Sequence, residues 1–301
     1  MEAQPTPARL LIVDGHAYAY RAFHAIQSLT GPDGAPTNAI YGFIKMLARM
    51  ESGLKPTHRV VVWDGGLSAD RRSALPEYKS QRPSMPDDLA RQMPELKFYL
   101  EGMSISSWVR NGVEADDWIA SLACRASQDG MQVVIASADK DFFQLISPRI
   151  GLLNPNDKTE TIWQAEQVRT KTGVEPEQIV DWLSLMGDAV DNIAGVPGVG
   201  PKTATDLMKQ FGSIEQMYAR LDEVKSERIR ANLRVAEEVV RRNQKLIRLD
   251  PGLPCDADLT PLAVRPADAE RLGPLYARWG FKTMLAQLEA ARGPQRELEW
   301  S

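Results

Sequence analysis

The stretch "RLLIVDG" at residues 9–15 is a short apolar run that ends in Asp-Gly, and "RVVVWDG" at 59–65 has the same form. Such runs are typical of strands in a parallel sheet that is covered on both faces. Together with the spacing of apolar residues elsewhere, they predict an α/β domain with helices on both faces of its sheet. Three further strands are expected at 102–109, 131–139 and 149–154, and two helices are expected at 38–52 and 115–128.

The second half of the chain has a different pattern. After about residue 176 the strands are expected to stop, and short helices follow that are bounded by Gly, Pro or Ser. The longest of them is predicted over roughly residues 226–248. We expect a loose tail at residues 1–8 and an α/β domain at 9–175. A helical module should follow at 176–252, and C-terminal helices at 253–301 should pack back on the core.

The composition argues against several classes of protein. The 301 residues are 43% hydrophobic and 25% charged, which is ordinary for a globular chain. The longest apolar runs are too short to cross a bilayer, and the N-terminus has no secretory signal pattern. Two cysteines do not make a disulfide framework. We therefore expect a cytoplasmic protein that has no membrane partner.

Nine acids stand in short motifs, and several of these motifs follow a predicted strand. The carboxyl ends of parallel strands meet at one edge of a sheet, where ligands bind, so these acids are expected to share a crevice. They would repel one another unless cations neutralised them, and hard oxygen ligands favour Mg²⁺ or Mn²⁺. Taken singly, the same motifs are typical of turns, helix starts or solvated loops. The nine are Asp14, Asp64, Glu114, Asp116, Asp117, Asp139, Asp141, Asp188 and Asp191.

The net charge of −4 does not exclude a nucleic-acid partner. Without the nine clustered acids, the 36 Lys and Arg residues outnumber the remaining Asp and Glu. The surface around the crevice could therefore be basic. Asp188 and Asp191 are three residues apart, so on a helical turn they would share one face.

The segment "GVPGVGPKTA" at 195–204 follows these two acids directly. Glycines allow a close approach of the backbone to phosphate, and Pro201 is placed to begin a helix whose amides face outward. A helix, a Gly-x-Gly hairpin and a second helix could bind duplex phosphates without reading bases. A tight turn between two helices is the alternative interpretation. The candidate contacts to DNA are Gly195, Gly198, Gly200, Lys202 and Thr203.

A basic segment at about 70–100 includes Tyr78 and is interrupted by prolines. It follows the strand end at Asp64 and is expected to overhang the acids, where cations would follow the phosphates of a single strand and rings would stack on bases. A solvated surface helix is the alternative. Its basic residues are Arg71, Arg72, Lys79, Arg82, Arg91 and Lys97.

Five motifs, in this order along the chain, resemble the flap endonuclease family and in particular the 5′-to-3′ exonuclease domain of bacterial DNA polymerase I. They are "LLIVDGHAYAYRAFHA", "YKSQRPSMPDDL", "VEADDWIASLA", "ASADKDFFQLI" and "LMGDAVDNIAGVPGVGPKTA". The resemblance implies a PIN-like (resolvase-like) α/β domain with a helical arch at about 70–100. It also implies a helix–three-turn–helix (helix-hairpin-helix) module.

The same resemblance implies roles for individual residues. Asp14, Asp64, Glu114, Asp116 and Asp117 would hold or support the first of two Mg²⁺ ions, for which Mn²⁺ could substitute, and Asp139, Asp141, Asp188 and Asp191 would serve the second. Lys79 and Arg82 would contact the scissile phosphate as catalytic residues. Tyr20 would stack on a base, next to Arg21, while Arg71 and Tyr78 would belong to the arch. The hairpin carbonyls would hold a K⁺ ion.

The function implied is a metal-dependent 5′-to-3′ exonuclease or 5′-flap endonuclease that acts in primer removal and repair. Its expected substrates are DNA with 5′ ends, flaps or nicks, and also RNA–DNA hybrids. A DNA polymerase is an expected partner, and we expect a monomer associated with the nucleoid. A branched-DNA-binding protein without catalysis and a PIN-type ribonuclease are the alternatives. A stand-alone nuclease and a domain of a longer polymerase are equally compatible with the sequence.

Overall fold

The structure is a computed structural model that describes residues 8–157, 159–255 and 258–292. These residues form two compact units. The first comprises residues up to Asp14, Val62–Ser84 and Val109–Ala257, and the second comprises Gly15–Val61, Met85–Trp108 and the residues from Asp258 onward. No helix among the described residues is long and apolar enough to cross a membrane. The expected tail at 1–8 lies outside the described residues except for residue 8.

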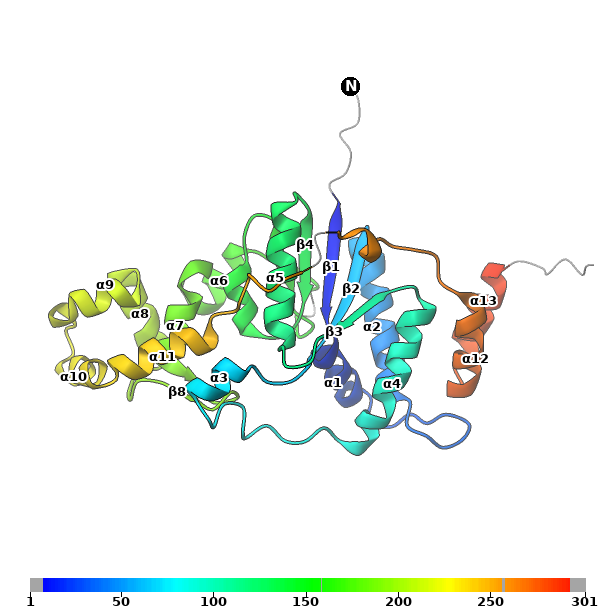
Figure 1. Cartoon of the computed structure of the whole chain (residues 1–301), viewed down its shortest axis with the longest axis horizontal. Helices are drawn as coiled ribbons and strands as arrows, with labels where there is room; N and C mark the ends of the chain where they lie inside the picture. The colour runs from blue at the N-terminus through cyan, green and yellow to red at the C-terminus, as the bar shows by residue number, and fades with distance from the viewer. Residues whose placement is uncertain (1–7, 158, 256–257, 293–301) are drawn as a thin grey trace, which may run out of the picture. The chain divides into compact units, whose positions relative to one another are not determined.

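The first unit contains a mostly parallel arrangement of strands. β1 pairs in parallel with β4, β4 pairs in parallel with β5, and the short β6 closes the edge antiparallel to β5. β1, β4 and β5 are rich in Val, Ile and Leu and are mostly buried, in part because α5 packs against β1 and β4 (Figure 1). Their bounds are β1 Arg9–Asp14, β4 Gln132–Ala136, β5 Ile150–Leu153, β6 Ile162–Trp163 and α5 Ala115–Gln128.

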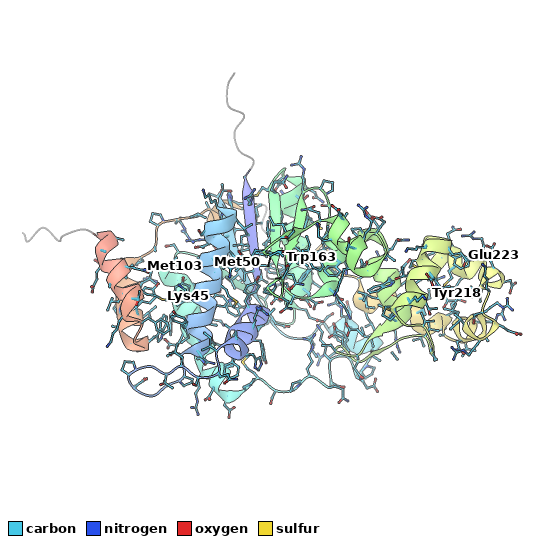
Figure 2. The ribbon with its side chains drawn as sticks, turned by 180° about the vertical axis from the view of Figure 1, so that it is seen from behind. Lys45, Met50, Met103, Trp163, Tyr218 and Glu223 are labelled. Carbon is cyan, nitrogen blue, oxygen red and sulfur yellow. The ribbon has the colours of Figure 1, made fainter. Side chains whose placement is uncertain are left out.

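The remaining elements of the first unit are mainly helical. Tyr218 on α9 donates a hydrogen bond to the Leu233 carbonyl on α10, and the Arg241 guanidinium of α11 lies over the Tyr218 ring, so three helices share one contact (Figure 2). The elements are α3 Ala69–Ala74, η1 Lys140–Leu145, α6 Ala165–Thr172, η2 Pro176–Gln178, α7 Ile179–Met186, β7 Gly187–Asp188, β8 Ile193–Ala194, α8 Pro201–Phe211, α9 Ile214–Ala219, η3 Leu221–Glu223, α10 Glu227–Val235 and α11 Glu237–Ile247.

The second unit is built on helices around two strands. The side chain of Gln92 on α4 accepts hydrogen bonds from the Ala39 and Ile40 amides at the start of α2, and it donates to Asn38, so it satisfies the first turn of α2 from outside. Trp279 on α12 donates to Glu95 on α4. The elements are α1 Gly15–Ala25, α2 Asn38–Leu54, β2 His58–Trp63, α4 Asp87–Gly102, β3 Ser106–Val109, η4 Thr260–Leu262, α12 Ala269–Trp279 and α13 Lys282–Arg292, with β2 and β3 both ending in the first unit.

Three local expectations are wrong. The strand expected at 102–109 begins only at Ser106, because α4 continues to Gly102. The helix expected at 226–248 is two helices, since Ala236 leaves helical geometry with ψ of 6°. Strands do not stop at residue 176, because β7 and β8 form a short antiparallel ladder.

Candidate functional site

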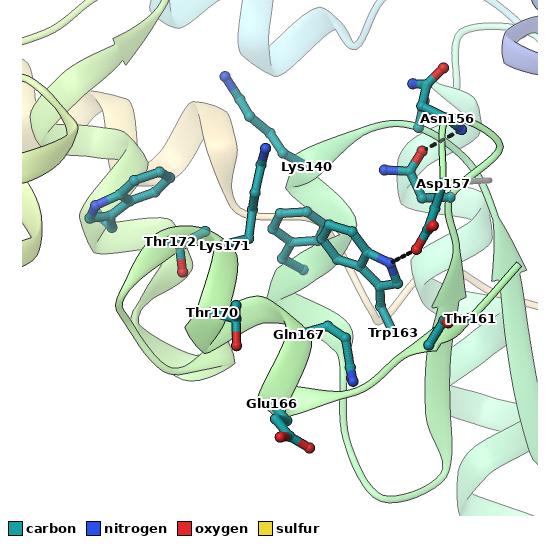
Figure 3. A pocket seen from close by; sticks show the side chains of 14 residues that line it. Lys140, Asn156, Asp157, Thr161, Trp163, Glu166, Gln167, Thr170, Lys171 and Thr172 are labelled. Atoms are coloured by element: carbon teal, nitrogen blue, oxygen red, sulfur yellow. Dashed lines mark hydrogen bonds between the residues drawn. The ribbon is translucent and has the colours of Figure 1, made fainter. Parts of the chain in front are cut away.

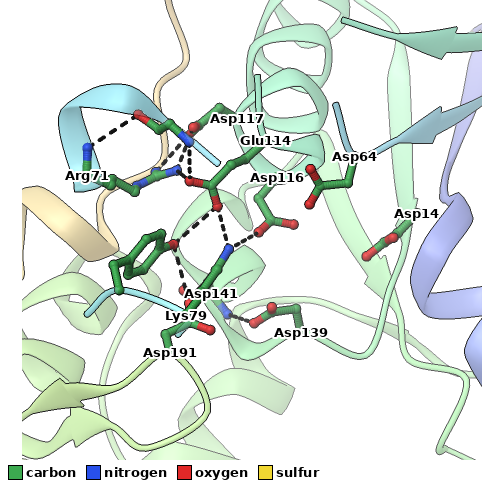
Figure 4. Close-up of polar contacts among 12 residues, drawn as sticks. Asp14, Asp64, Arg71, Lys79, Glu114, Asp116, Asp117, Asp139, Asp141 and Asp191 are labelled. Atoms are coloured by element: carbon green, nitrogen blue, oxygen red, sulfur yellow. Dashed lines mark hydrogen bonds and ion pairs between the residues drawn. The ribbon is translucent and has the colours of Figure 1, made fainter. Parts of the chain in front are cut away.

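All nine predicted acids belong to the first unit, and they come from the ends of several elements. Asp14 ends β1, Asp64 follows β2, and Glu114 precedes α5. Asp139 caps η1 by accepting a hydrogen bond from the Asp141 amide. In Figure 4 the carboxylates of Asp14, Asp64, Asp116 and Asp139 turn toward one space. Electrostatic repulsion links Asp116 to Asp139 and Asp14, and Asp141 to Asp139, Asp116, Asp191 and Asp188.

Asp188 and Asp191 do not lie on a helical turn, so that expectation is wrong. Asp188 ends β7, and Asp191 lies in the turn before β8. Asp188 accepts a hydrogen bond from the Val190 amide, and its Oδ2 is 3.1 Å from Lys140 Nζ. Gly187 and Gly195 require bare backbone here, because a Cβ on Gly195 would lie 2.0 Å from the Met186 carbonyl oxygen. A hairpin, rather than a helix, presents these two acids.

We call Glu114, Asp117 and Asp191 the paired acids, because each directly meets Arg71, Lys79 or Arg82. Asp188, whose partner is Lys140, is considered separately. The Arg71 guanidinium lies 2.6 and 2.8 Å from the two oxygens of Asp117 and 3.1 Å from Glu114. Lys79 Nζ forms an ion pair with Glu114 and lies 3.8 Å from both Asp116 and Asp191. Burial by itself would raise the pKa of Glu114, but Lys79 and Arg71 hold that pKa below its usual value. Glu114 therefore remains ionised.

The Lys79 segment is fixed by its backbone as well as by its charge. The Lys79 amide donates to the Asp191 carbonyl at 3.0 Å, and Asn192 Nδ2 donates to the Glu77 carbonyl. Lys79 has a φ of 56°, in the left-handed region that a residue with a Cβ rarely adopts. Arg82 Nη2 lies 2.6 Å from Asp191 Oδ1. The two basic residues that were predicted to be catalytic, Lys79 and Arg82, thus lie beside the acids, as Figure 4 shows for Lys79.

Arg71 and Tyr78 were predicted to contact DNA, and the structure buries both of them. Arg71 also donates to the Leu246 and Arg248 carbonyls, while the Tyr78 hydroxyl lies 3.2 Å from Glu114 and 3.4 Å from Asp191. These contacts position the acids and leave neither side chain open to a partner. Asp117 accepts hydrogen bonds from Arg71 on both oxygens and a third from the Asp250 amide, which favours a supporting role over metal ligation.

We call Asp116, Asp139 and Asp141 the open acids. Burial, together with the charges of neighbouring carboxylates, raises the pKa of Asp116 and Asp141 well above the usual range, and burial raises that of Asp139. Oδ1 of Asp141 is buried and has no hydrogen-bond partner among the described residues. Concentrated negative charge and an orphaned carboxylate oxygen fit a hard divalent cation.

The acids are not, however, in coordinating positions as they stand. Within the residues described, no three His, Cys, Asp or Glu side chains are arranged to hold one metal ion. The Lys79 ammonium lies among Glu114, Asp116 and Asp191. The nine metal-ligand assignments therefore stay predictions.

The Gly-x-Gly hairpin at residues 195–200, which follows the β7–β8 ladder, presents bare backbone. Gly198 has a φ of +80°, and no atom lies within 4 Å of the position that a Cβ on Gly200 would take. Pro201 begins α8, while Lys202 is exposed and Thr203 is partly exposed. The geometry is compatible with phosphate contacts, which remain a prediction, as does K⁺ at this hairpin.

Tyr20 and Arg21 lie on α1 of the second unit, and both are partly exposed. The Tyr20 ring stacks with His24 at 6.3 Å between centroids. Their predicted contacts with DNA therefore remain predictions.

Two supporting residues were missed from the sequence. Ser137 donates to Asp14 and accepts from the Asp139 amide, which joins the ends of β1 and β4. Asn243, fully buried on α11, donates to the Ser184 and Ala194 carbonyls and so holds the β7–β8 hairpin. Ser137 stands within the motif that contains Asp139, which was a usable signal. Nothing in the sequence around Asn243 indicates its partners.

Two family models match consecutive parts of the chain. The model described as the N-terminal resolvase-like domain of 5′-3′ exonuclease matches residues 9–173, and the model of the C-terminal SAM fold of 5′-3′ exonuclease matches residues 174–270. Together they cover the α/β and helical parts, and the change from one to the other falls where the sequence changes character.

Curated relatives have similar identity but different lengths. A 5′-3′ exonuclease of Aquifex aeolicus is 37% identical over 281 residues, which are 93% of this chain and 95% of that protein. DNA polymerase I of Bacillus caldotenax is 38% identical over 284 residues, which are 94% of this chain and 32% of that protein. The chain thus spans about a third of the polymerase relatives.

Solved structures of low identity share the fold. A bacteriophage T5 flap endonuclease in a complex with DNA and metal ions aligns with a TM-score of 0.68 at 22% identity, over 94% of this chain and 99% of that one. The catalytic core of Rad2 in complex with DNA substrate aligns with a TM-score of 0.63 at 17% identity, over 94% of this chain and 93% of that one. The α/β class with a resolvase-like domain is confirmed.

Proposed function

Because the chain belongs to the 5′-3′ exonuclease family, we propose that it is a structure-specific nuclease that hydrolyses DNA phosphodiesters at 5′ ends and flaps. The observation that carries this proposal is the coexistence of open and paired acids in one site. The open acids supply uncompensated negative charge, and the paired acids fix two cations, Lys79 and Arg82, beside it. Hydrolysis of a phosphodiester uses both kinds of group, acids that can hold metal ions and cations that contact the phosphate.

Divalent ions, which we propose to be two Mg²⁺ with Mn²⁺ as a substitute, fit the open acids. The open acids would hold them together with Asp14, Asp64 and Asp188, the last in exchange for its ion pair with Lys140. Glu114, Asp117 and Asp191 would support that set. Bound there, the ions supply Lewis-acid polarisation of the phosphate and a lowered pKa for water.

The chain's own cations act on the phosphate. Burial by itself would lower the pKa of Lys79, but the surrounding carboxylates have the larger effect and raise that pKa above its usual value. The ammonium therefore stays charged at neutral pH. Entry of a phosphate gives Lys79 and Arg82 a second anionic partner besides Glu114 and Asp191. Both side chains can then stabilise the charge that grows on the phosphate oxygens in the transition state. Their fixed position keeps the reorganisation cost small.

We further propose that the substrates include nicked DNA and RNA–DNA hybrids, and that the protein acts in primer removal and repair as a monomer, with a DNA polymerase as partner. The polymerase relatives support this partner, since in two of them the matched region covers 94% and 97% of this chain. The open hairpin at 195–200 supports a grip on duplex phosphate, and its carbonyls could hold K⁺.

A flap assay tests the proposal. A 5′-flap DNA labelled at its 3′ end is incubated with the protein in Mg²⁺, in Mn²⁺ and in chelator. We expect cleavage near the flap junction only with metal. A single-stranded RNA of the same sequence serves as control, and preferential cleavage of that RNA would indicate a PIN-type ribonuclease. Tight binding without cleavage in either metal would indicate a branched-DNA-binding protein.

A further inference from the structure

A groove of about 840 Å³ lies beside the acid site in the first unit, in the size range of small-ligand sites. Its walls come from η1, the β5–β6 connection, α6 and α7 (Figure 3). Lys140, which stands between Asp139 and Asp141, lines one end, and its Nζ is 3.1 Å from Asp188. The groove therefore begins where the acid cluster ends.

Trp163 lines the groove and is held in one orientation. Its indole N–H donates to Asp157 Oδ2 at 2.9 Å, and Phe143 stacks on its ring at 5.4 Å between centroids. Asp157 in turn accepts hydrogen bonds from the amide and hydroxyl of Thr159. These hydrogen bonds from Thr159 and Trp163 lower the pKa of Asp157, so the anchor stays ionised. A fixed, partly exposed indole offers a stacking surface without the cost of ordering it.

The groove carries charges of both signs, and the ionised Asp157 stands beside Trp163. Figure 3 shows Lys140 and Lys171 at one end and Glu166 at the other. Lys171, in the last turn of α6, is exposed and has no ion pair within the described residues. Gln167 and Thr170 place neutral hydrogen-bonding groups between the two ends. This distribution suits a ligand with a phosphate at one end and an uncharged, flat polar group beside it.

We infer that the groove binds one nucleotide of the DNA strand next to the cleaved phosphodiester, with its base stacked on Trp163 and its phosphate at Lys140 and Lys171. The inference rests on the proposed function, since the strand must first enter the acid site. The recognition is independent of sequence, because any base presents a flat π face. The groove thereby positions the nucleotide that adjoins the one being cleaved.

Binding of fluorescent 5′-flap DNA in chelator, which prevents turnover, measures affinity without cleavage, and groove variants then report the share that the groove contributes. Trp163→Ala should weaken binding by about 5- to 150-fold, the range for loss of one base–aromatic stack, while Trp163→Phe keeps most of the affinity. Lys171→Gln should lower the slope of log affinity against log salt by about 0.7–0.9 for one lost phosphate contact. Lys45→Gln, an exposed lysine on α2 that does not line the groove, is the matched control and should change neither value.

Photocrosslinking identifies the strand. Flap DNA carries a single 5-iodouracil at successive positions of either the cleaved strand or its complement, and crosslinked peptides are sequenced. We expect a crosslink to Trp163 from one position next to the scissile phosphate on the cleaved strand. A crosslink from the complement only would overturn the assignment of the strand.

The two proposals fail in different ways. If the native chain binds flap DNA, Trp163→Ala and Trp163→Phe fold and bind as it does, and no crosslink reaches Trp163, then the groove is not a nucleotide site, although the nuclease assignment stands. If the native chain binds no flap DNA at all, the proposed function and the groove are both wrong.

Discussion

The paired acids and the open acids are the same kind of side chain in one site, but they differ in what surrounds them. Glu114, Asp117 and Asp191 each have a guanidinium or ammonium within 3.1 Å. Asp139 and Asp141 have no such partner among the described residues, and Asp116 reaches Lys79 only at 3.8 Å. Charge is thus balanced on one side of the site and left unbalanced on the other.

This difference assigns separate tasks to the two groups. A carboxylate that is already bound to Arg or Lys has few lone pairs left for a metal, so the paired acids act as a scaffold. An acid whose pKa is raised by its neighbours gains the most from a cation, so the open acids are where the ion is expected. Repulsion among the open acids lowers the stability of the folded protein, and a cost of this kind is common at functional sites.

The largest expected effect comes from removing an open acid. Asp141→Ala should reduce flap cleavage by about 10³-fold or more, on the scale of losing a strong electrostatic stabiliser of the transition state. Binding of flap DNA in chelator should be much less affected. Single-turnover cleavage and fluorescence binding, measured on the same preparation, separate the two. Undiminished turnover would remove Asp141 from the metal site.

The next effect comes from the paired side and concerns stability. Arg71→Met should lower the free energy of unfolding by about 3–5 kcal/mol, because Asp117 then stays buried without its cation, while Glu114 keeps only Lys79. Arg71→Lys keeps the charge but loses the two-pronged contact with Asp117, so it should lie between Met and the native residue. Urea unfolding measures all three. Equal stability of Arg71→Met and the native chain would show that this pair is no scaffold.

The sequence predicts the membership of this site but not its division into two groups. Asp14, Asp64 and Asp139 could be found because strand ends converge at one sheet edge. The pairing of Arg71 with Asp117 could not, since it depends on where α3 packs against α11. Arg71 and Tyr78 look like surface residues in sequence, because a basic, proline-broken stretch is usually solvated, and only the tertiary contacts show that they are buried. The turn at Asp191 was missed because a three-residue spacing fits a helix as well as a hairpin.

Lys79 connects the two groups, and its loss should affect chemistry. Lys79→Gln removes a cation from beside the phosphate and should lower the single-turnover cleavage rate by about 10²–10³-fold. Lys79→Arg should recover part of this loss, since charge is retained while the shape of the donor changes. If the rate constant is unchanged while only flap affinity falls, Lys79 serves binding alone, and its place among the acids is incidental to catalysis.

The smallest expected effect is a change in the free energy of unfolding that has opposite signs for an open acid and a paired acid. In chelator at pH 7–8, Asp141→Asn should raise the free energy of unfolding, because it removes a charge that the neighbouring carboxylates repel. Glu114→Gln should lower stability, because the buried Lys79 and Arg71 each lose one of their anionic partners. The pKa of Asp141 is raised in the folded state, so the native chain loses stability as pH rises from the ordinary Asp value through the raised one. The advantage of Asp141→Asn should therefore vanish below pH 4, where the native Asp141 is protonated. Urea unfolding at pH 4 and pH 7.5 measures this change, and a stability loss in both substitutions would mean that the open acids are compensated after all.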